Sequence, residues 1–140
     1  MVTVTRCNVG IKGNLVSTAQ DNERLVRAFC ASWESKEVNE IMAYFAPDAI
    51  YHNIPMAPLR GHEEIEGFLS FLGMVKAISF EILVLLADDH RVFTERVDHF
   101  EMPDGKTIDL PVCGILEIEG GKITAWRDYF DAAPFADMFS

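Results

Sequence analysis

Two aspartates and one arginine carry the clearest chemical signal in the sequence. Arg96 and Asp98 stand two residues apart in the stretch 91–100, RVFTERVDHF, which is rich in β-branched and aromatic residues and therefore typical of a strand. Alternate residues of a strand share a face, so these two side chains should project together. Asp128 lies in a second such stretch, ITAWRDYFD. Desolvation raises the pKa of a carboxyl and a guanidinium lowers it, so the three residues could supply an acid and a base.

The same charges have a simpler explanation, because ion pairs on the solvated face of a sheet are common and contribute little to stability. A second polar pair, Tyr51 and Asn53, shares one face of a short predicted strand, AIYHNI at 49–54. Their hydroxyl and amide groups could together hold one water molecule. Tyr51 could equally be an interfacial aromatic residue, and Asn53 a turn residue before Pro55. The spacing alone leaves both explanations open for each pair.

Several other kinds of site are not expected from this sequence. The four histidines lack the paired spacing of metal ligands, and neither a nucleophile elbow nor a glycine-rich phosphate loop is present. We therefore expect neither a metal nor an organic cofactor. The formal net charge of -10 argues against nucleic acid or an anionic membrane as a partner.

Composition and apolar patterning favour one soluble domain. The chain has 140 residues and a hydrophobic content of 49%, which is enough for a single core and too much for a disordered protein. No 18-residue apolar span and no start resembling a signal peptide occur, and the three cysteines form no disulfide framework. We expect a cytoplasmic protein with an N-terminal tail at 1–17 and one domain at 18–140.

Three helices are predicted in the first half of that domain. The first should begin at Thr18, which with Asp21 has the spacing of a capping box. A second apolar stripe at helical spacing starts at Val38 and should be stopped by Pro47, because the residue before a proline disfavours the helical conformation. A third helix is predicted from the apolar stripe at 61–75.

The second half is predicted to be a meander of strands closed by a last helical turn at 134–139. The strands are expected at 77–87, 91–102, 107–119 and 122–130. Pro-Asp-Gly-Lys and Gly-Gly mark the last two hairpin turns, and Pro111 should lie at an edge or a bulge. Helices followed by an antiparallel meander are typical of an α+β fold with the helices on one face of the sheet. A strongly curled sheet would leave a cavity beneath them.

Three segments of the chain resemble the limonene-1,2-epoxide hydrolase family. They are Tyr51-x-Asn53, the ERVD segment at 95–98 and GKITAWRDYFD at 121–131, and their order and spacing match over about residues 20 to 135. The resemblance implies an NTF2-like α+β cone, in which a curved mixed β-sheet carries N-terminal helices on its concave face. It also implies a homodimer that takes a small apolar epoxide and water as substrates.

The resemblance implies a role for each polar candidate as well. Asp128 would be the general base on a water that Tyr51 and Asn53 also hold. Asp98 would be the acid that protonates the epoxide oxygen, and Arg96 would bridge the two carboxyls. Six apolar residues would line the substrate cavity, although all of them would also serve as plain core: Leu69, Leu72, Phe100, Leu110, Val112 and Phe135. Because Phe100 is bulky for its place beyond Asp98, the terpene substrate of the family is not carried over.

We therefore expect an epoxide hydrolase that forms a vicinal diol by one-step acid/base attack of water. Two alternatives stay open. One is a ketosteroid-isomerase-like or polyketide-cyclase-like enzyme, in which one aspartate would remove a proton from carbon; an arginine between the two acids favours water activation instead. The other is a non-catalytic NTF2-like module that binds a small molecule and has no need of both carboxyls.

Overall fold

The computed structural model describes residues 18–138, so the tail predicted at 1–17 lies outside the described residues. The strands are β1 (Phe45–Asn53), β2 (Leu59–Arg60), β3 (Ala77–Ala87), β4 (Arg91–Glu101), β5 (Thr107–Glu119) and β6 (Lys122–Tyr129). The α-helices are α1 (Ala19–Ser32), α2 (Val38–Met42), α3 (Gly61–Leu69) and α4 (Ala132–Asp137). Short 3-10 turns, η1 (Trp33–Ser35) and η2 (Ser70–Met74), extend α1 and α3.

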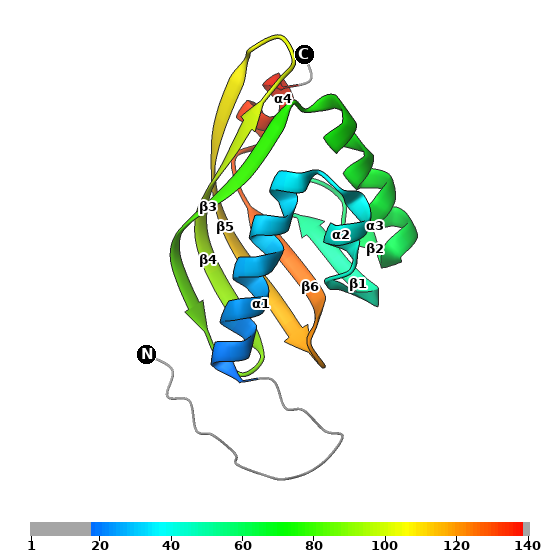
Figure 1. Cartoon of the computed structure of the whole chain (residues 1–140), viewed down its shortest axis with the longest axis vertical. Coiled ribbons are helices and arrows are strands. Elements are labelled where there is room, and N and C mark those ends of the chain that lie inside the picture. Colours follow the sequence, from blue (N-terminus) through cyan, green and yellow to red (C-terminus); the bar gives the residue numbers. More distant parts are fainter. Residues whose placement is uncertain (1–17, 139–140) are drawn as a thin grey trace.

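The strands form one mixed sheet in the order β2-β1-β6-β5-β4-β3. β1 and β6 are parallel, and the other neighbouring strands are antiparallel. The sheet is strongly curved, and α1, α2 and α3 lie against its concave side (Figure 1). This confirms the predicted α+β cone with N-terminal helices on the concave face. None of the helices between residues 18 and 138 is long and apolar enough to span a membrane.

The local sequence explains where α1 begins and which face it buries. The Thr18 hydroxyl accepts a hydrogen bond from the Asp21 backbone N–H at 3.1 Å, and the Asp21 carboxylate accepts one from the Thr18 N–H at 3.2 Å. This is the predicted capping box. Val26, Phe29 and Trp33 share the face toward the sheet and are at most 1% exposed, so burial of that face holds α1 against the strands.

The prediction for the second helix is wrong at the C-terminal end of that helix. α2 ends at Met42, and Phe45 already belongs to β1, where it pairs with Ile123 of β6. Pro47 lies inside β1, in the irregular part between Phe45 and Ile50 where the register shifts, a place where a strand tolerates proline. Helical spacing could not reveal this end, because the strand that captures Phe45 is far away in the sequence.

The hairpins of the second half lie where the sequence predicts them. β3 and β5 have their predicted bounds, and Gly120 and Gly121 adopt φ values of 58° and 76° in the turn before β6, as a two-residue hairpin turn requires. β5 pairs with β6 only from Cys113 onward. Pro111 therefore lies where β5 has β4 as its only neighbour, the predicted edge position.

The final helix begins earlier than predicted. α4 starts at Ala132 because the Asp131 side chain caps it, accepting a hydrogen bond from the Ala133 N–H at 3.0 Å. The capping aspartate shifts the start two residues ahead of the predicted 134. α4 lies at the end of the sheet where β4 and β5 are joined (Figure 1).

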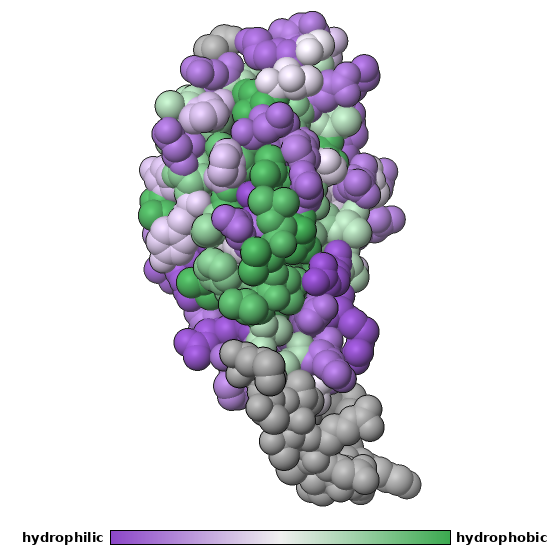
Figure 2. Space-filling view, turned by 90° about the vertical axis from the view of Figure 1, so that its left-hand side faces the viewer, coloured by the Kyte–Doolittle hydropathy of each residue, from purple (hydrophilic) through white to green (hydrophobic). Residues whose placement is uncertain are grey.

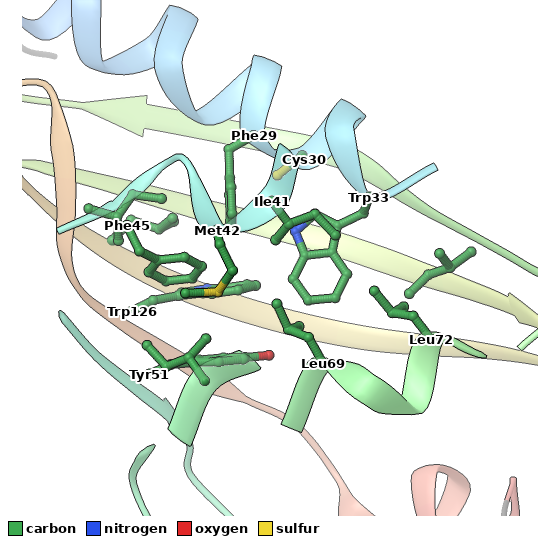
Figure 3. Packing of buried hydrophobic residues seen from close by; sticks show 14 of the residues in the cluster. Phe29, Cys30, Trp33, Ile41, Met42, Phe45, Tyr51, Leu69, Leu72 and Trp126 are labelled. Atoms are coloured by element: carbon green, nitrogen blue, oxygen red, sulfur yellow. The ribbon is translucent and has the colours of Figure 1, made fainter. Parts of the chain in front are cut away.

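Aromatic side chains fill the core between the helices and the sheet (Figure 3). Phe29 of α1 meets Phe45 and Trp126 edge to face, with ring centroids 5.5 and 5.0 Å apart. Trp126 in turn stacks on Tyr51, with centroids 4.2 Å apart and ring planes 5° apart. Such rings combine a large buried area with a specific geometry, so they hold β1 and β6 in a defined position under α1.

Candidate active site

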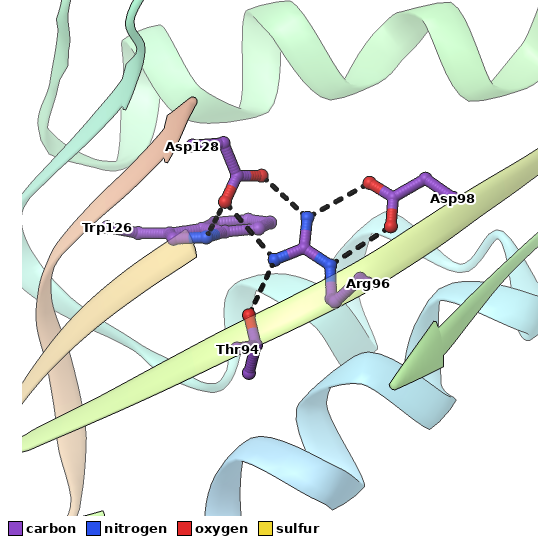
Figure 4. Close-up of polar contacts among 5 residues, drawn as sticks. All are labelled: Thr94, Arg96, Asp98, Trp126 and Asp128. Atoms are coloured by element: carbon purple, nitrogen blue, oxygen red, sulfur yellow. Dashed lines mark hydrogen bonds and ion pairs between the residues drawn. The ribbon is translucent and has the colours of Figure 1, made fainter. Parts of the chain in front are cut away.

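Arg96 is the centre of a buried polar network on the concave face of the sheet (Figure 4). Its Nε and Nη2 donate to Asp98 at 3.0 and 2.9 Å, and its Nη1 and Nη2 donate to Asp128 at 3.2 and 2.8 Å. Nη1 also donates to Thr94 Oγ1 at 3.1 Å. These bonds give an acceptor to each of the five guanidinium N–H groups. The predicted contact of Arg96 with both aspartates is confirmed.

The network is almost completely removed from solvent. Arg96, Asp98 and Asp128 are 1%, 4% and 3% exposed. Burial by itself lowers the pKa of Arg96, but the two carboxylates raise it well above its ordinary value, so the guanidinium stays charged. It also lies over the rings of Phe80 and Trp126, 5.0 and 5.7 Å from their centroids, which adds cation–π attraction. A solvated surface ion pair is thereby excluded.

Asp98 can exchange a proton near neutral pH. Burial raises the pKa of Asp98 to about 6, the Arg96 guanidinium opposes this rise, and the Asp128 carboxylate adds to it. One guanidinium neutralises only one of two carboxylates, so the network is electrically neutral when one carboxyl carries a proton. Arg96 offers N–H donors and no acceptor. A proton on Asp98 is therefore available to a molecule in front of it.

The stability of the protein should report this proton directly. Between the ordinary pKa of 3.8 and the folded-state pKa of about 6, the folded protein binds more protons at Asp98 than the unfolded chain does. The contribution of Asp98 to the free energy of unfolding therefore falls as the pH rises. Relative to Asp98→Asn, the wild type should lose about 2 kcal/mol of unfolding free energy between about pH 4.5 and pH 7.5. Urea denaturation of both proteins measures this; a constant difference would contradict it.

Trp126 and Thr94 complete the network, and the sequence pattern identified neither as functional. Trp126 Nε1 donates to Asp128 Oδ1 at 2.7 Å. Strand parity places these two residues on one face, but it does not show that the indole N–H points at the carboxylate. Trp126 and Arg96 together fill three of the roughly four acceptor positions of the Asp128 carboxylate. One acceptor position remains, on Oδ2.

Tyr51 and Asn53 reach the network from β1. The parallel register pairs Tyr51 with Trp126 and Asn53 with Asp128. Burial raises the pKa of Tyr51 well above its ordinary value, the Asp128 carboxylate raises it further, and a hydrogen bond with Asn53 lowers it. The phenol is therefore neutral and can donate a hydrogen bond. The structure thus brings together all five polar residues that the sequence predicts for the site: Arg96, Asp98, Asp128, Tyr51 and Asn53.

A small cavity of about 30 Å³ lies in front of the two carboxyls. Its polar lining consists of Tyr51, Asn53, Asp98 and Asp128. Five phenylalanines form most of its apolar wall: Phe68, Phe71, Phe100, Phe130 and Phe135. A polar cavity of this size has room for a water molecule.

Four of the six apolar residues predicted for the cavity line it: Phe100, Leu110, Val112 and Phe135. Leu69 and Leu72 are not part of its lining; they are buried in the hydrophobic core (Figure 3). Phe68 and Phe71 from the same segment line the cavity instead. Periodicity could not resolve this shift of one position, because Phe68-Leu69 and Phe71-Leu72 are pairs of adjacent apolar residues and both members of a pair fit the same apolar stripe.

The histidines do not take part in the network. In the described part of the chain, which contains all four, no group of three or more His, Cys, Asp or Glu residues is arranged to hold a metal ion. His99 lies on the outer face of β4 between two carboxylates, and His52 and His62 contact backbone carbonyl groups. The groups that could transfer protons in the cavity are therefore the two carboxyls and the phenol.

Comparison with known proteins gives consistent matches. The family described as limonene-1,2-epoxide hydrolase catalytic domain matches residues 20–140. Epoxide hydrolase EphG of Mycobacterium tuberculosis is 31% identical over 116 residues, which cover 81% of this chain and 74% of that protein. The solved structure of an M. tuberculosis LEH-like epoxide hydrolase has a TM-score of 0.73 at 30% identity and covers 86% of this chain and 88% of its own.

More distant structures share the fold alone. A putative polyketide cyclase from Xanthomonas campestris has a TM-score of 0.77 at 21% identity, and the match covers 89% of this chain and 100% of that one. The fold is therefore shared by proteins with different descriptions, whereas the family model that matches residues 20–140 is that of the limonene-1,2-epoxide hydrolase catalytic domain. On these grounds the chain belongs to the limonene-1,2-epoxide hydrolase family.

Proposed function

We propose that the protein hydrolyses an apolar epoxide to a vicinal diol in one step, with water as the second substrate. The observation that carries the proposal is the buried arginine bridge. A single guanidinium holds two carboxyls at one end of a cavity with apolar walls. The family of the chain and the relative named as an epoxide hydrolase support the same reaction.

Asp128 acts as the general base. The remaining acceptor position of its carboxylate can hold a water molecule, which Tyr51 and Asn53 can bind from the β1 side. The water oxygen attacks one carbon of the epoxide ring while one of its protons passes to Asp128. Arg96 and Trp126 fix the orientation of the carboxylate, so the water is held in a position from which it can react.

Asp98 acts as the general acid. As the ring C–O bond breaks, the Asp98 O–H proton passes to the epoxide oxygen, which becomes the second hydroxyl of the diol. The network takes up one proton at Asp128 and gives up one at Asp98, so its total charge is unchanged. Return of one proton from Asp128 to Asp98 through water restores the starting state. The Arg96 charge is constant throughout and needs no rearrangement during the step.

The alternatives explain less of this geometry. An isomerase or cyclase that removes a proton from carbon needs one base and one donor to an oxyanion, and it has no use for a cation bonded to both carboxyls. A binding module would carry the desolvation cost of a buried arginine and two buried carboxyls without a function for them. The likeness to the putative polyketide cyclase is a likeness of fold.

The cavity wall indicates the kind of epoxide. Flat aromatic walls favour aryl or compact cyclic substituents, but a volume of about 30 Å³ requires the cavity to widen before such a molecule enters. Phe135 of α4 packs against Phe71 and Phe130, with ring centroids 6.4 and 5.9 Å apart. No residue between Ala132 and Asp137 is fully buried. Displacement of α4 would therefore open the cavity, and its main cost would be the exposure of Phe135 and of Met138, the buried residue that caps the helix at its C-terminal end.

A screen of cyclic and aryl epoxides for diol formation tests the proposed function. We expect turnover of at least one member, and kcat/KM should fall as the pH rises through about 6, because Asp98 then loses the proton it donates. A flat profile would count against the acid/base scheme. Isomerisation of an unsaturated ketone without any diol formation would favour the alternative enzyme, an isomerase or cyclase that removes a proton from carbon.

We propose in addition that the protein is a homodimer joined through the convex face of the sheet. Leu83, Leu86 and Phe93 on that face are 53%, 60% and 38% exposed, and Figure 2 shows an apolar patch along it. A hollow of about 290 Å³ lies beside Leu86 and Phe93. A two-fold interface brings the same patch of both subunits together, so an apolar side chain of one copy can enter the hollow of the other.

Light scattering on purified protein tests the dimer. The wild type should have twice the mass of the chain, and Leu86→Glu should shift it to monomers, because a charged group would replace an apolar contact in the interface and lose its water. Met74→Glu is the matched control, since Met74 is 54% exposed on η2, away from this face. A monomeric wild type would contradict the proposal and leave the proposed reaction standing.

A further inference from the structure

Gly114 lies in the middle of β5, directly beneath the polar network. The strand registers pair it with Thr94 of β4 on one side and with Asp128 of β6 on the other. Paired residues of antiparallel strands project from the same face. A side chain at Gly114 would therefore rise from the concave face between two members of the network.

The space above Gly114 is occupied by the network itself. A Cβ atom placed there would lie 2.6 Å from Arg96 Nη1 and 3.2 Å from Thr94 Oγ1, and it would overlap Asp128 Oδ1. Non-bonded carbon atoms are most stable about 3.5 to 4.0 Å apart and repel one another at much shorter distances. Even one methyl group at residue 114 is therefore incompatible with the present positions of Arg96 and Asp128. The chain offers a clear contrast at Gly67 and Gly73, where a Cβ atom would meet nothing within 4 Å.

We propose that Gly114 is a positioning residue of the active site, whose missing side chain leaves the gap through which the Arg96 guanidinium crosses β5 to reach Asp128. Arg96 starts on β4 and Asp128 on β6, so β5 separates their backbones. The guanidinium spans this strand through Nη1 and Nη2, which donate to the two oxygens of Asp128. The inference rests on the proposed function for its effect on turnover and on geometry alone for the gap.

A side chain in this gap would affect the two carboxyls unequally. Arg96 and Asp98 both belong to β4, and their bonds use Nε and Nη2, whereas the Cβ position of Gly114 is nearest to Nη1 and to Asp128 Oδ1. Asp128 Oδ1 also accepts the Trp126 N–H. A methyl group at this point would separate Arg96 from Asp128 and leave the bonds between Arg96 and Asp98 in place. The base would lose its orientation while the acid kept its partner.

The first test is Gly114→Ala on the full chain, with Gly67→Ala as its control. Kinetics on an epoxide that the wild type turns over should show kcat about 100-fold lower, as expected for a reacting group displaced by about 1 Å, and little change in KM. Gly67→Ala should behave as the wild type, because residue 67 is exposed and its Cβ position is open. A Gly114→Ala variant with wild-type kcat would overturn the inference.

A crystal structure of Gly114→Ala separates this inference from the proposed reaction, because it needs no substrate. We expect the distance between Arg96 Nη2 and Asp128 Oδ2, which is 2.8 Å in the wild type, to exceed hydrogen-bonding range. The Nε to Asp98 distance should stay near 3.0 Å. An unchanged bridge to Asp128 would overturn the inference whether or not the protein hydrolyses epoxides.

A double-mutant cycle, measured by thermal denaturation, tests the inference even if Gly114→Ala folds poorly. It compares the wild type, Gly114→Ala, Asp128→Ala and the double variant. If the methyl group clashes with the network, the loss of Tm caused by Gly114→Ala should shrink by more than half once the Asp128 carboxylate is removed, because Arg96 can then move into the vacated space. Equal losses in both backgrounds would assign the glycine a backbone role and overturn the inference.

Discussion

Asp128→Asn and Asp98→Asn should each lower kcat about 10³- to 10⁴-fold on any epoxide that the wild type turns over. An asparagine at 128 keeps the size of the side chain and can still accept hydrogen bonds, but its amide cannot take a proton from water. An asparagine at 98 has no acidic proton to give to the ring oxygen. Both variants should remain folded, because each substitution preserves the volume of a buried side chain.

The double variant distinguishes a concerted step from two separate ones. If attack by water and protonation of the ring oxygen occur together, the second substitution should add little to the first, since groups that act as a unit give non-additive losses. Asp109→Asn is a suitable control: Asp109 is an exposed carboxylate that contacts His99 on the outer face, and its loss should leave kcat unchanged. Wild-type turnover by Asp98→Asn would remove the acid from the mechanism.

Strands bounded by strong turn signals could be predicted from the sequence almost to the residue. β3 ends at Ala87 before two aspartates, and β5 ends at Glu119 before two glycines, and both ends depend on local chemistry. The C-terminal end of α2 could not be predicted, because Phe45 is drawn into β1 by pairing with Ile123. The spacing of apolar residues along one segment gives no information about a pairing partner that is distant in the sequence. The cytoplasmic location and the tail at 1–17 stay predictions.

The site shows the same division between local and non-local information. Strand parity alone places Arg96 and Asp98 on one face, but their contact with Asp128 depends on the registers of β4, β5 and β6 relative to one another. The resemblance to a family supplied what parity could not. The role of the Trp126 N–H depends on the rotamer of one side chain, and the empty space at Gly114 depends on two registers at once. Neither could be read from spacing.

A diol can also be formed by a route in which an enzyme carboxylate attacks the ring carbon and gives an ester. That route needs a nucleophilic aspartate and a separate base, commonly histidine, to activate the water that releases the ester. Here the carboxylates of Asp98 and Asp128 are both bonded to Arg96. None of the four histidines, all of which the structure describes, lines the cavity. The geometry therefore favours direct attack by water.

A single turnover in water labelled with heavy oxygen should accordingly place one labelled oxygen in nearly all of the first-formed diol, with enzyme in excess over substrate. Direct attack takes the new oxygen from solvent in the first cycle, whereas the ester route takes it from the carboxylate and labels the enzyme instead. Mass spectrometry of the diol and of the peptide that contains Asp128 distinguishes the two. Unlabelled diol with label in an aspartate would refute direct attack and leave the epoxide assignment intact. Labelled diol with an unlabelled peptide would exclude the ester route and leave direct attack by water, because a carboxylate that attacks carbon gives up one of its own oxygens.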